Sequence, residues 1–220
     1  MTNRRAPDFF LVGTAKSGTS SLWHCFGEHP EIYVTSDPGL KELGFFASDH
    51  GMQDWSAYLD HFSEAKQDQL IGEVCNSYLS DTTCAERIHE ELPHSKILII
   101  LRNPVERAAS LHNWMVREGY ESIRKFEDAL KAEEDRWQNK DFRRRNTHGN
   151  YRNYLYKRSG LYFAQINRYS KTFDESQLHI ELFDDLRTKP QETLKRIFSF
   201  LDVDSSFEPE FTVLNKSGGI

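Results

Sequence analysis

One segment near the N-terminus, FFLVGTAKSGTSSLW (9–23), constrains the fold more than any other part of the sequence. A short apolar run leads into a turn that contains Gly13 and Gly18, and apolar residues at helical spacing follow. A strand, a glycine turn and a helix in this order aim backbone N–H groups at one point, and the helix N-terminus adds partial positive charge. The segment therefore predicts a binding loop for a phosphate-like anion.

The position of the lysine in this loop narrows its chemistry. In nucleotide hydrolases the pattern G-x-x-x-x-G-K-[ST] places the lysine after the second glycine, and the Ser or Thr holds magnesium. Here Lys16 lies between the two glycines, and Thr19 follows the second glycine directly. The apolar run KILIIL (96–101) leads into Arg102 and not into the aspartate that a magnesium site needs. We expect metal-free transfer from a short phosphoanhydride rather than triphosphate hydrolysis.

The rest of the chain indicates a single α/β domain over residues 1–220. A chain of 220 residues, 38% hydrophobic, can bury one substantial core. Short apolar runs alternate with helical patterns, which is typical of a mainly parallel sheet flanked by helices. The expected strands are residues 8–13, 70–74, 96–101 and 177–183. The expected helices are residues 19–29, 82–92, 103–120, 126–138, 161–173 and 190–201.

Composition argues against several other classes of function. The formal net charge of -6 disfavours nucleic-acid binding, because affinity for a phosphate backbone comes from accumulated Lys and Arg. The three cysteines have no C-x-x-C spacing and the nine histidines form no metal-binding helix pattern, so we expect neither a metal site nor a disulfide framework. No long apolar segment is visible, so neither a signal peptide nor a membrane span is expected, and a cytoplasmic location follows. The sequence indicates no particular oligomeric state.

A second motif, RNPVERAASLHNWM (102–115), follows the apolar run 96–101. Asn103 suits the N-cap of a helix, and Pro104 suits its first position. Ligands of open α/β sheets bind outside the carboxyl ends of the strands. We therefore expect this motif and the loop around Lys16 to lie at the same edge of the sheet.

Together the two motifs resemble those of sulfotransferases that use 3′-phosphoadenosine 5′-phosphosulfate (PAPS). GTAKSGTSSL (13–22) is similar to their 5′-phosphosulfate loop, and ILRNPVERAASLHNW (100–114) resembles their 3′-phosphate motif R-x-P-x-x-R-x-x-S. The resemblance also includes HPEIYVTSDPGLKELGFF (29–46), GEVCNSYL (72–79), GLY (160–162), LFDDLRTKP (182–190) and IFSFLDV (197–203). It is strongest to the carbohydrate and heparan-type branch, and it implies a three-layer P-loop-like α/β fold.

The resemblance also implies a site and a reaction. The residues that would hold the 5′-phosphosulfate are Lys16, Ser17, Gly18, Thr19 and Ser20. Arg102 and Ser110 would hold the 3′-phosphate, and Glu42, in an E-x-x-F-F pattern, would be the catalytic base. The expected reaction moves the sulfuryl group to a hydroxyl or amine, with a saccharide as the favoured acceptor, needs no metal, and releases adenosine 3′,5′-bisphosphate.

Alternatives remain at the level of function and of single residues. A nucleotide-dependent kinase and a catalytically silent module that binds nucleotide or glycan are the rival functions. Glu73 is either a second acidic group at the acceptor site or a structural partner of a buried donor, and Phe183 either edges the adenine or belongs to the core. We interpret Arg107 as a helix-surface or ion-pair residue and assign His24 and His112 to packing or capping rather than to the role of base.

Two features depart from the family pattern, and one further stretch bears on the acceptor. Val74 stands where heparan-type relatives often have lysine, so a lysine contact to the acceptor is in doubt. The family normally continues into a segment that closes over the nucleotide, whereas this sequence stops at Ile220, so either that segment was removed or another element covers the cofactor. The basic, tyrosine-rich stretch 139–158 either contacts a charged or polar saccharide, with its tyrosine rings stacked on sugars, or forms a solvated helix face.

Overall fold

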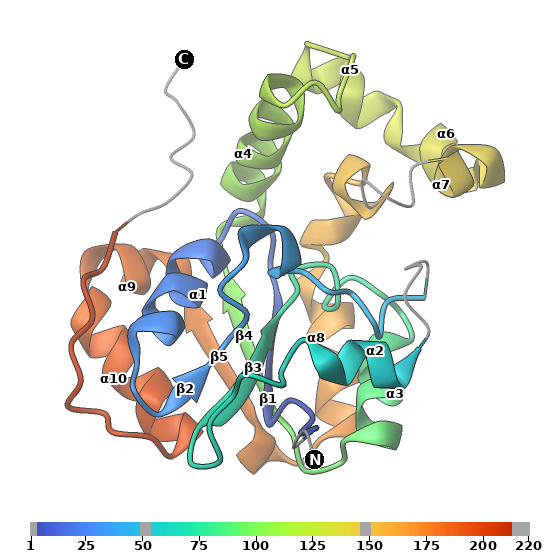
Figure 1. Cartoon of the computed structure of the whole chain (residues 1–220). Helices are drawn as coiled ribbons and strands as arrows, with labels where there is room; N and C mark the ends of the chain where they lie inside the picture. Colours follow the sequence, from blue (N-terminus) through green and yellow to red (C-terminus); the bar gives the residue numbers. More distant parts are fainter. Residues whose placement is uncertain (1–3, 49–53, 146–150, 213–220) are drawn as a thin grey trace.

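The computed structural model describes residues 4–48, 54–145 and 151–212, and its centre is a five-stranded sheet (Figure 1). The strand order is β2-β3-β1-β4-β5, and each neighbouring pair is parallel. The strands are β1 Phe9–Gly13, β2 Ile32–Tyr33, β3 Leu70–Val74, β4 Lys96–Leu101 and β5 Leu178–Leu182. Their carboxyl ends therefore meet at one edge of the sheet.

Helices cover both faces of the sheet and form three layers with it (Figure 1). One face carries α1 (Thr19–Glu28), α9 (Phe183–Thr188) and α10 (Pro190–Leu201), and the other carries α2 (Trp55–Asp60), α3 (Cys84–Glu91) and α8 (Tyr162–Thr172). The expected α/β fold class with a parallel central sheet is confirmed. In the described parts of the chain, no helix is both long and apolar enough to cross a membrane.

A smaller group of helices lies beyond the carboxyl edge of the sheet (Figure 1). Its members are α4 (Pro104–Arg117), α5 (Phe126–Lys131), α6 (Glu133–Gln138) and α7 (Lys140–Arg145). Short 3₁₀ turns complete the chain: η1 (Pro38–Leu40), η2 (Tyr151–Tyr154), η3 (Arg158–Gly160) and η4 (Glu175–Gln177). Because α4 begins directly after β4, the second motif projects from the sheet edge where β1 also ends.

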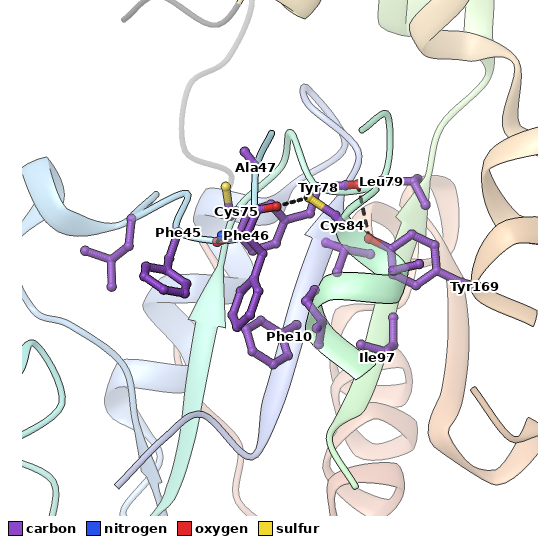
Figure 2. Packing of buried hydrophobic residues seen from close by; sticks show 14 of the residues in the cluster. Phe10, Phe45, Phe46, Ala47, Cys75, Tyr78, Leu79, Cys84, Ile97 and Tyr169 are labelled. Carbon is purple, nitrogen blue, oxygen red and sulfur yellow. Dashed lines mark hydrogen bonds between the residues drawn. The ribbon is translucent and has the colours of Figure 1, made fainter. Parts of the chain in front are cut away.

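The alternation of side chains along β1 divides the core in two. Phe10 and Val12 pack under α2, α3 and α8, whereas Phe9 and Leu11 pack under α1 and α10. Figure 2 shows the first of these clusters, in which the ring of Phe46 lies edge-on to Phe10. All residues of β1 are buried, as expected for a central strand of a parallel sheet.

Most of the predicted elements are present, with shifted ends. The expected helix 126–138 is interrupted at Ala132 into α5 and α6, and the expected strand 177–183 ends one residue early because Phe183 starts α9. The N-cap role of Asn103 is confirmed, since its Oδ1 accepts hydrogen bonds from the N–H groups of Val105 (3.0 Å) and Glu106 (3.3 Å). β2 and α2 have no counterpart among the predicted elements. The chain end at Ile220 lies outside the described residues.

Candidate active site

The loop between β1 and α1 has a backbone that only a few residue types adopt. Gly18 has φ 90° directly before α1, and a Cβ there would lie 3.1 Å from a methyl group of Leu186 and 3.2 Å from the ring of Phe183. Both facts require glycine. Lys16 also has a positive φ, 66°, which is uncommon for a residue with a side chain and is typical of functional loops. The loop therefore leads into the N-terminus of α1 and carries a lysine just before it.

The ammonium of Lys16 lies among other cations. Its Nζ is 5.4 Å from the centre of the Trp114 ring on α4. Burial, and after it the nearby charges of Arg117, Arg102 and Lys41, lower the pKa of Lys16 to about 8. A cluster of like charges around one point is unfavourable without a ligand and suits a multiply charged anion.

The hydroxyl residues of the loop have different surroundings. Ser17 is fully buried, and its Oγ lies 2.5 Å from the Oγ1 of Thr14, so its side chain supports the loop from inside. Thr19 is buried, and the Oγ of half-buried Ser20 accepts a hydrogen bond from the Nζ of Lys41 at 3.2 Å. The contact of Ser17 with the anion stays a prediction, because its Oγ is buried and its N–H donates to the carbonyl oxygen of Thr14 at 3.3 Å.

Arg102 joins the second motif to this loop. Its Nη1 donates a hydrogen bond to the carbonyl oxygen of Lys16 at 3.2 Å, and its guanidinium lies over the ring of Phe183, 4.8 Å from the centre. Phe183 in turn packs against the core under α1 and α10. Ser110 is buried on α4, the helix that starts directly after Asn103. The two motifs lie at the same sheet edge, as the sequence predicts.

Glu42 lies beside the same loop. Its Oε1 accepts hydrogen bonds from Nδ2 of Asn76 at 2.6 Å and from Nζ of Lys41 at 3.2 Å, and its side chain is 37% exposed. Since Lys41 also reaches Ser20, one ammonium connects the carboxylate to the anion loop. Sequence reasoning missed Asn76 and Lys41 as site residues, although Asn76 follows a buried strand at its carboxyl end, where ligand contacts are expected.

Glu73 lies below the surface and is only 2% exposed. Its carboxylate accepts hydrogen bonds from the hydroxyls of Tyr58 (2.5 Å) and Tyr78 (2.6 Å) and from the N–H of Gly44 (3.3 Å). Burial raises the pKa of Glu73 to about 7, which the hydrogen bonds from these three donors oppose. These contacts favour the structural alternative for Glu73 over direct contact with an acceptor.

The remaining candidates have structural roles in this arrangement. The helix-surface interpretation of Arg107 is wrong: it is 1% exposed and its Nη2 donates to the carbonyl oxygen of Tyr156 at 2.6 Å. His112 is buried with its Nε2 2.8 Å from the carbonyl oxygen of Ile123, and His24 lies 3.2 Å from Glu28 on α1. Packing and local pairing therefore account for both histidines.

The basic stretch 139–158 divides into exposed and buried parts, and residues 146–150 of it lie outside the described residues. Tyr154 and Tyr156 are 7% and 0% exposed, so stacking of these rings on sugars is wrong. Arg152 is buried against Asp81 at 2.8 Å. Arg144 and Arg145, at the end of α7, are exposed, and Arg143 is half-buried.

Comparison with known proteins places this chain in a family. The sulfotransferase domain profile matches residues 6–216, and the chain therefore belongs to the sulfotransferase family. A crystal structure of a sulfotransferase from Alicyclobacillus acidocaldarius superposes with a TM-score of 0.84 at 31% identity, over 94% of this chain and 85% of that one.

Curated relatives include enzymes of heparan sulfate. Heparan sulfate glucosamine 3-O-sulfotransferase 5 of Mus musculus is 29% identical over 91% of this chain and 54% of its own length. The bifunctional heparan sulfate N-deacetylase/N-sulfotransferase 1 of Caenorhabditis elegans is 24% identical over 96% of this chain. The chain spans only 23% of the length of the latter relative and 23% of a membrane-associated sulfotransferase of Dictyostelium discoideum that it also matches.

Proposed function

We propose that residues 1–220 form one sulfotransferase domain that moves the sulfuryl group of PAPS to a hydroxyl or amine of a saccharide. The observation that carries this proposal is the convergence of Lys16, Arg102 and Glu42 at one sheet edge, with Arg102 bonded to the backbone of Lys16. The heparan sulfate names of two relatives support a saccharide acceptor.

The donor has a distinct partner for each of its charged ends. The loop around Lys16 offers backbone N–H groups, the start of α1 and an ammonium to the 5′-phosphosulfate. Arg102 and Ser110 supply a guanidinium and a hydroxyl for the 3′-phosphate. The lowered pKa of Lys16 fits this role, because an ammonium crowded by cations gains most when an anion binds.

Glu42 takes the proton of the acceptor. Among the described residues its hydrogen bonds are to Oε1, from Asn76 and Lys41, so Oε2 faces no competing donor. In the transfer, the bond from sulfur to the phosphate oxygen breaks and a bond from sulfur to the acceptor oxygen or nitrogen forms. The acceptor proton moves to Glu42, and Lys16 stabilises the negative charge that collects on the leaving phosphate. The reaction needs no metal, since cationic side chains carry the stabilisation.

A binding test followed by a transfer test decides between this function and its rivals. PAPS and adenosine 3′,5′-bisphosphate should each raise the melting temperature, whereas ATP with magnesium should not. Transfer of labelled sulfate from PAPS is then measured with a panel of desulfated and sulfated glycosaminoglycan oligosaccharides. Stabilisation by ATP with magnesium alone would indicate a kinase. Stabilisation by PAPS without transfer to any acceptor would indicate a silent binding module.

A further inference from the structure

The carboxylate of Glu73 is buried without a cationic partner among the described residues. It accepts three hydrogen bonds, one each from Tyr58 on α2, Tyr78 after β3 and the N–H of Gly44 in the loop that carries Glu42. An ionised carboxylate in the interior is unfavourable unless donors compensate for lost water. Because three separate chain segments donate to one buried acid, we infer that Glu73 has a role beyond packing.

The three donors connect Glu73 to the segment 43–48, which follows Glu42. Tyr78 bonds to Glu73 and also accepts the N–H of Phe46 at 3.2 Å, so two backbone amides of the segment depend on this network. Figure 2 shows Phe46 next to Tyr78, with the thiol of Cys84 bonded to the carbonyl oxygen of Phe46. Hydrogen bonds therefore hold the backbone of this segment at Phe46 and at Gly44. Gly44 is two residues from Glu42, whose carboxylate is exposed.

Gly44 itself is the point where this anchor acts on the backbone. It has φ 69°, a left-handed conformation, and its N–H points into the carboxylate of Glu73. A change in the direction of that N–H turns the preceding peptide and with it the chain that carries Glu42. By contrast, the side-chain contacts of Glu42, to Asn76 and Lys41, lie at the exposed end of the site.

We propose that Glu73 is a positioning residue, whose ionised carboxylate anchors Gly44 through the network with Tyr58 and Tyr78 and thereby orients Glu42 toward the acceptor. The proposal rests on the proposed role of Glu42 as the base. Glu73 is too deeply buried to take the acceptor proton itself.

The charge state of this anchor changes near neutral pH. Burial, opposed by the three hydrogen bonds and assisted by the charge of Glu42, raises the pKa of Glu73 to about 7. The other titratable groups that face Glu73 are Tyr58, Tyr78 and Cys75, whose pKa values burial raises well above their usual range, so they stay neutral. Lys41 and Glu73 line one small cavity. Phe10, which lies opposite Glu73 on the neighbouring strand β1, is apolar.

Protonation of Glu73 weakens the anchor. A carboxylate accepts all three donors, whereas a carboxyl group brings a proton of its own and leaves one tyrosine hydroxyl without an acceptor. As pH falls through about 7, Glu42 should therefore become less well placed although it is still ionised itself. Turnover should then fall on the acid side of neutrality, well above the range in which an ordinary glutamate titrates.

The test compares Tyr58→Phe and Glu73→Gln with a matched control, Tyr169→Phe. Tyr169 is another fully buried tyrosine of the same cluster, but its hydroxyl donates to the carbonyl oxygen of Tyr78 at 3.1 Å and not to Glu73 (Figure 2). Removing the Tyr58 hydroxyl takes a donor from the ionised carboxylate and so raises the pKa of Glu73. The acid limb of the pH profile of kcat should therefore move to higher pH by about one unit or more. Tyr169→Phe should leave that limb in place.

Glu73→Gln removes the titration and the charge together. We expect kcat to fall roughly 10- to 100-fold, as for a misplaced catalytic group. The acid limb near neutrality should disappear, and the KM for PAPS should be unchanged because Glu73 does not touch the loop around Lys16. In the Glu73→Gln background, Tyr58→Phe should no longer shift the profile. An acid limb of the wild type that neither variant moves would overturn the proposal.

Hydrogen-exchange mass spectrometry provides a readout that does not depend on activity. Glu73→Gln and Tyr58→Phe should each speed exchange of the peptide that contains Gly44 and Phe46, and leave the loop 13–20 as in the wild type. Unchanged exchange of the Gly44 peptide would overturn the anchor even in a fully active enzyme. Faster exchange in a protein that transfers no sulfate would support the anchor and refute the proposed function, so the two failures are separable.

Discussion

The guanidinium of Arg102 donates a hydrogen bond from Nη1 to the carbonyl oxygen of Lys16 over 3.2 Å. The two residues are 86 positions apart and belong to the two motifs that the sequence predicts to share an edge of the sheet. This contact fixes the backbone of Lys16 in its left-handed conformation while its ammonium faces Trp114. Loss of the Lys16 side chain should therefore slow transfer from PAPS, whereas loss of the Arg102 side chain should weaken the binding of PAPS.

Lys16→Ala should lower kcat by about two orders of magnitude, the effect of losing one preorganised group that stabilises transition-state charge. The fold should survive, since the half-buried side chain belongs to none of the hydrophobic clusters of the core. Initial rates with saturating PAPS measure the loss, and circular dichroism checks the fold. Lys131→Ala, which removes an exposed lysine paired with Asp128, is the matched control and should keep wild-type turnover. Turnover near the wild-type value in folded Lys16→Ala would remove the lysine from the mechanism.

The pH dependence of kcat/KM for PAPS should report the titration of Lys16. Burial and neighbouring cations lower the pKa of Lys16 to about 8, so its charged form is present below that pH and is lost as pH rises through it. Because kcat/KM reflects groups of the free enzyme, kcat/KM for PAPS should fall above about pH 8, whereas kcat should hold to higher pH since the bound anion raises the pKa again. Lys16→Arg, which stays charged, should lose this alkaline limb. An alkaline limb that persists in Lys16→Arg would assign it to another group.

Arg102→Ala should weaken PAPS selectively over adenosine 5′-phosphosulfate, which lacks the 3′-phosphate. A charge-assisted hydrogen bond contributes roughly 1.5 to 3 kcal/mol, so the dissociation constant for PAPS should rise about 10- to 100-fold. Calorimetry with both donors measures the change. Arg117→Ala is the comparison, because it removes a nearby charge that is paired with Glu118 and should weaken both donors alike. Equal affinity of the wild type for the two donors would contradict the assignment.

Local patterns predicted the strands and both motifs because each depends on residues adjacent in sequence. β1, β3 and β4 are short apolar runs next to turns, and Asn103 caps its own helix. β2 was not predicted because it has only two residues, and α9 was not predicted because its first residue, Phe183, is apolar and directly follows the alternating pattern of the strand before it.

The contacts that complete the site come from distant segments and carry no local signal. Asn76 reaches Glu42 across 34 positions, and Arg107 reaches the carbonyl oxygen of Tyr156 across 49. Tyr154 and Tyr156 stand in a polar, basic stretch, yet they are buried because α4, α5 and α7 supply apolar neighbours for their rings. Burial of this kind is decided by tertiary packing, which the order of residues alone does not reveal.

Glu42→Gln should abolish turnover while leaving PAPS affinity intact. The amide keeps the shape of the side chain and can still accept from Asn76 through its oxygen, but it has no basic oxygen to take a proton. Rates with an active acceptor and calorimetry with PAPS separate the two effects, and both are repeated with excess EDTA, which should change neither. Asn76→Ala should lower kcat less, because it loosens the carboxylate without removing it. A Glu42→Gln variant with substantial turnover would transfer the role of base to another residue.

The arginines at the end of α7 should act on the acceptor if it is an anionic saccharide. Arg143 is half-buried and lies over the ring of Trp137, 5.6 Å from its centre, whereas Arg144 is exposed and pairs with Asp141 at 3.2 Å. Exposed charges attract an anion over roughly a Debye length, about 8 Å at physiological salt, and lose that attraction as salt rises. Replacing all three arginines at positions 143–145 by glutamine should raise the acceptor KM and make it less sensitive to salt, with PAPS affinity unchanged. The control replaces Lys66, Lys171 and Lys195, exposed lysines on other parts of the surface, which changes the net charge equally and should leave the acceptor KM as it is. If the acceptor KM at low salt is the same in both triple variants, α7 does not contact the acceptor, and the acceptor binds only at the edge of the sheet beside Glu42.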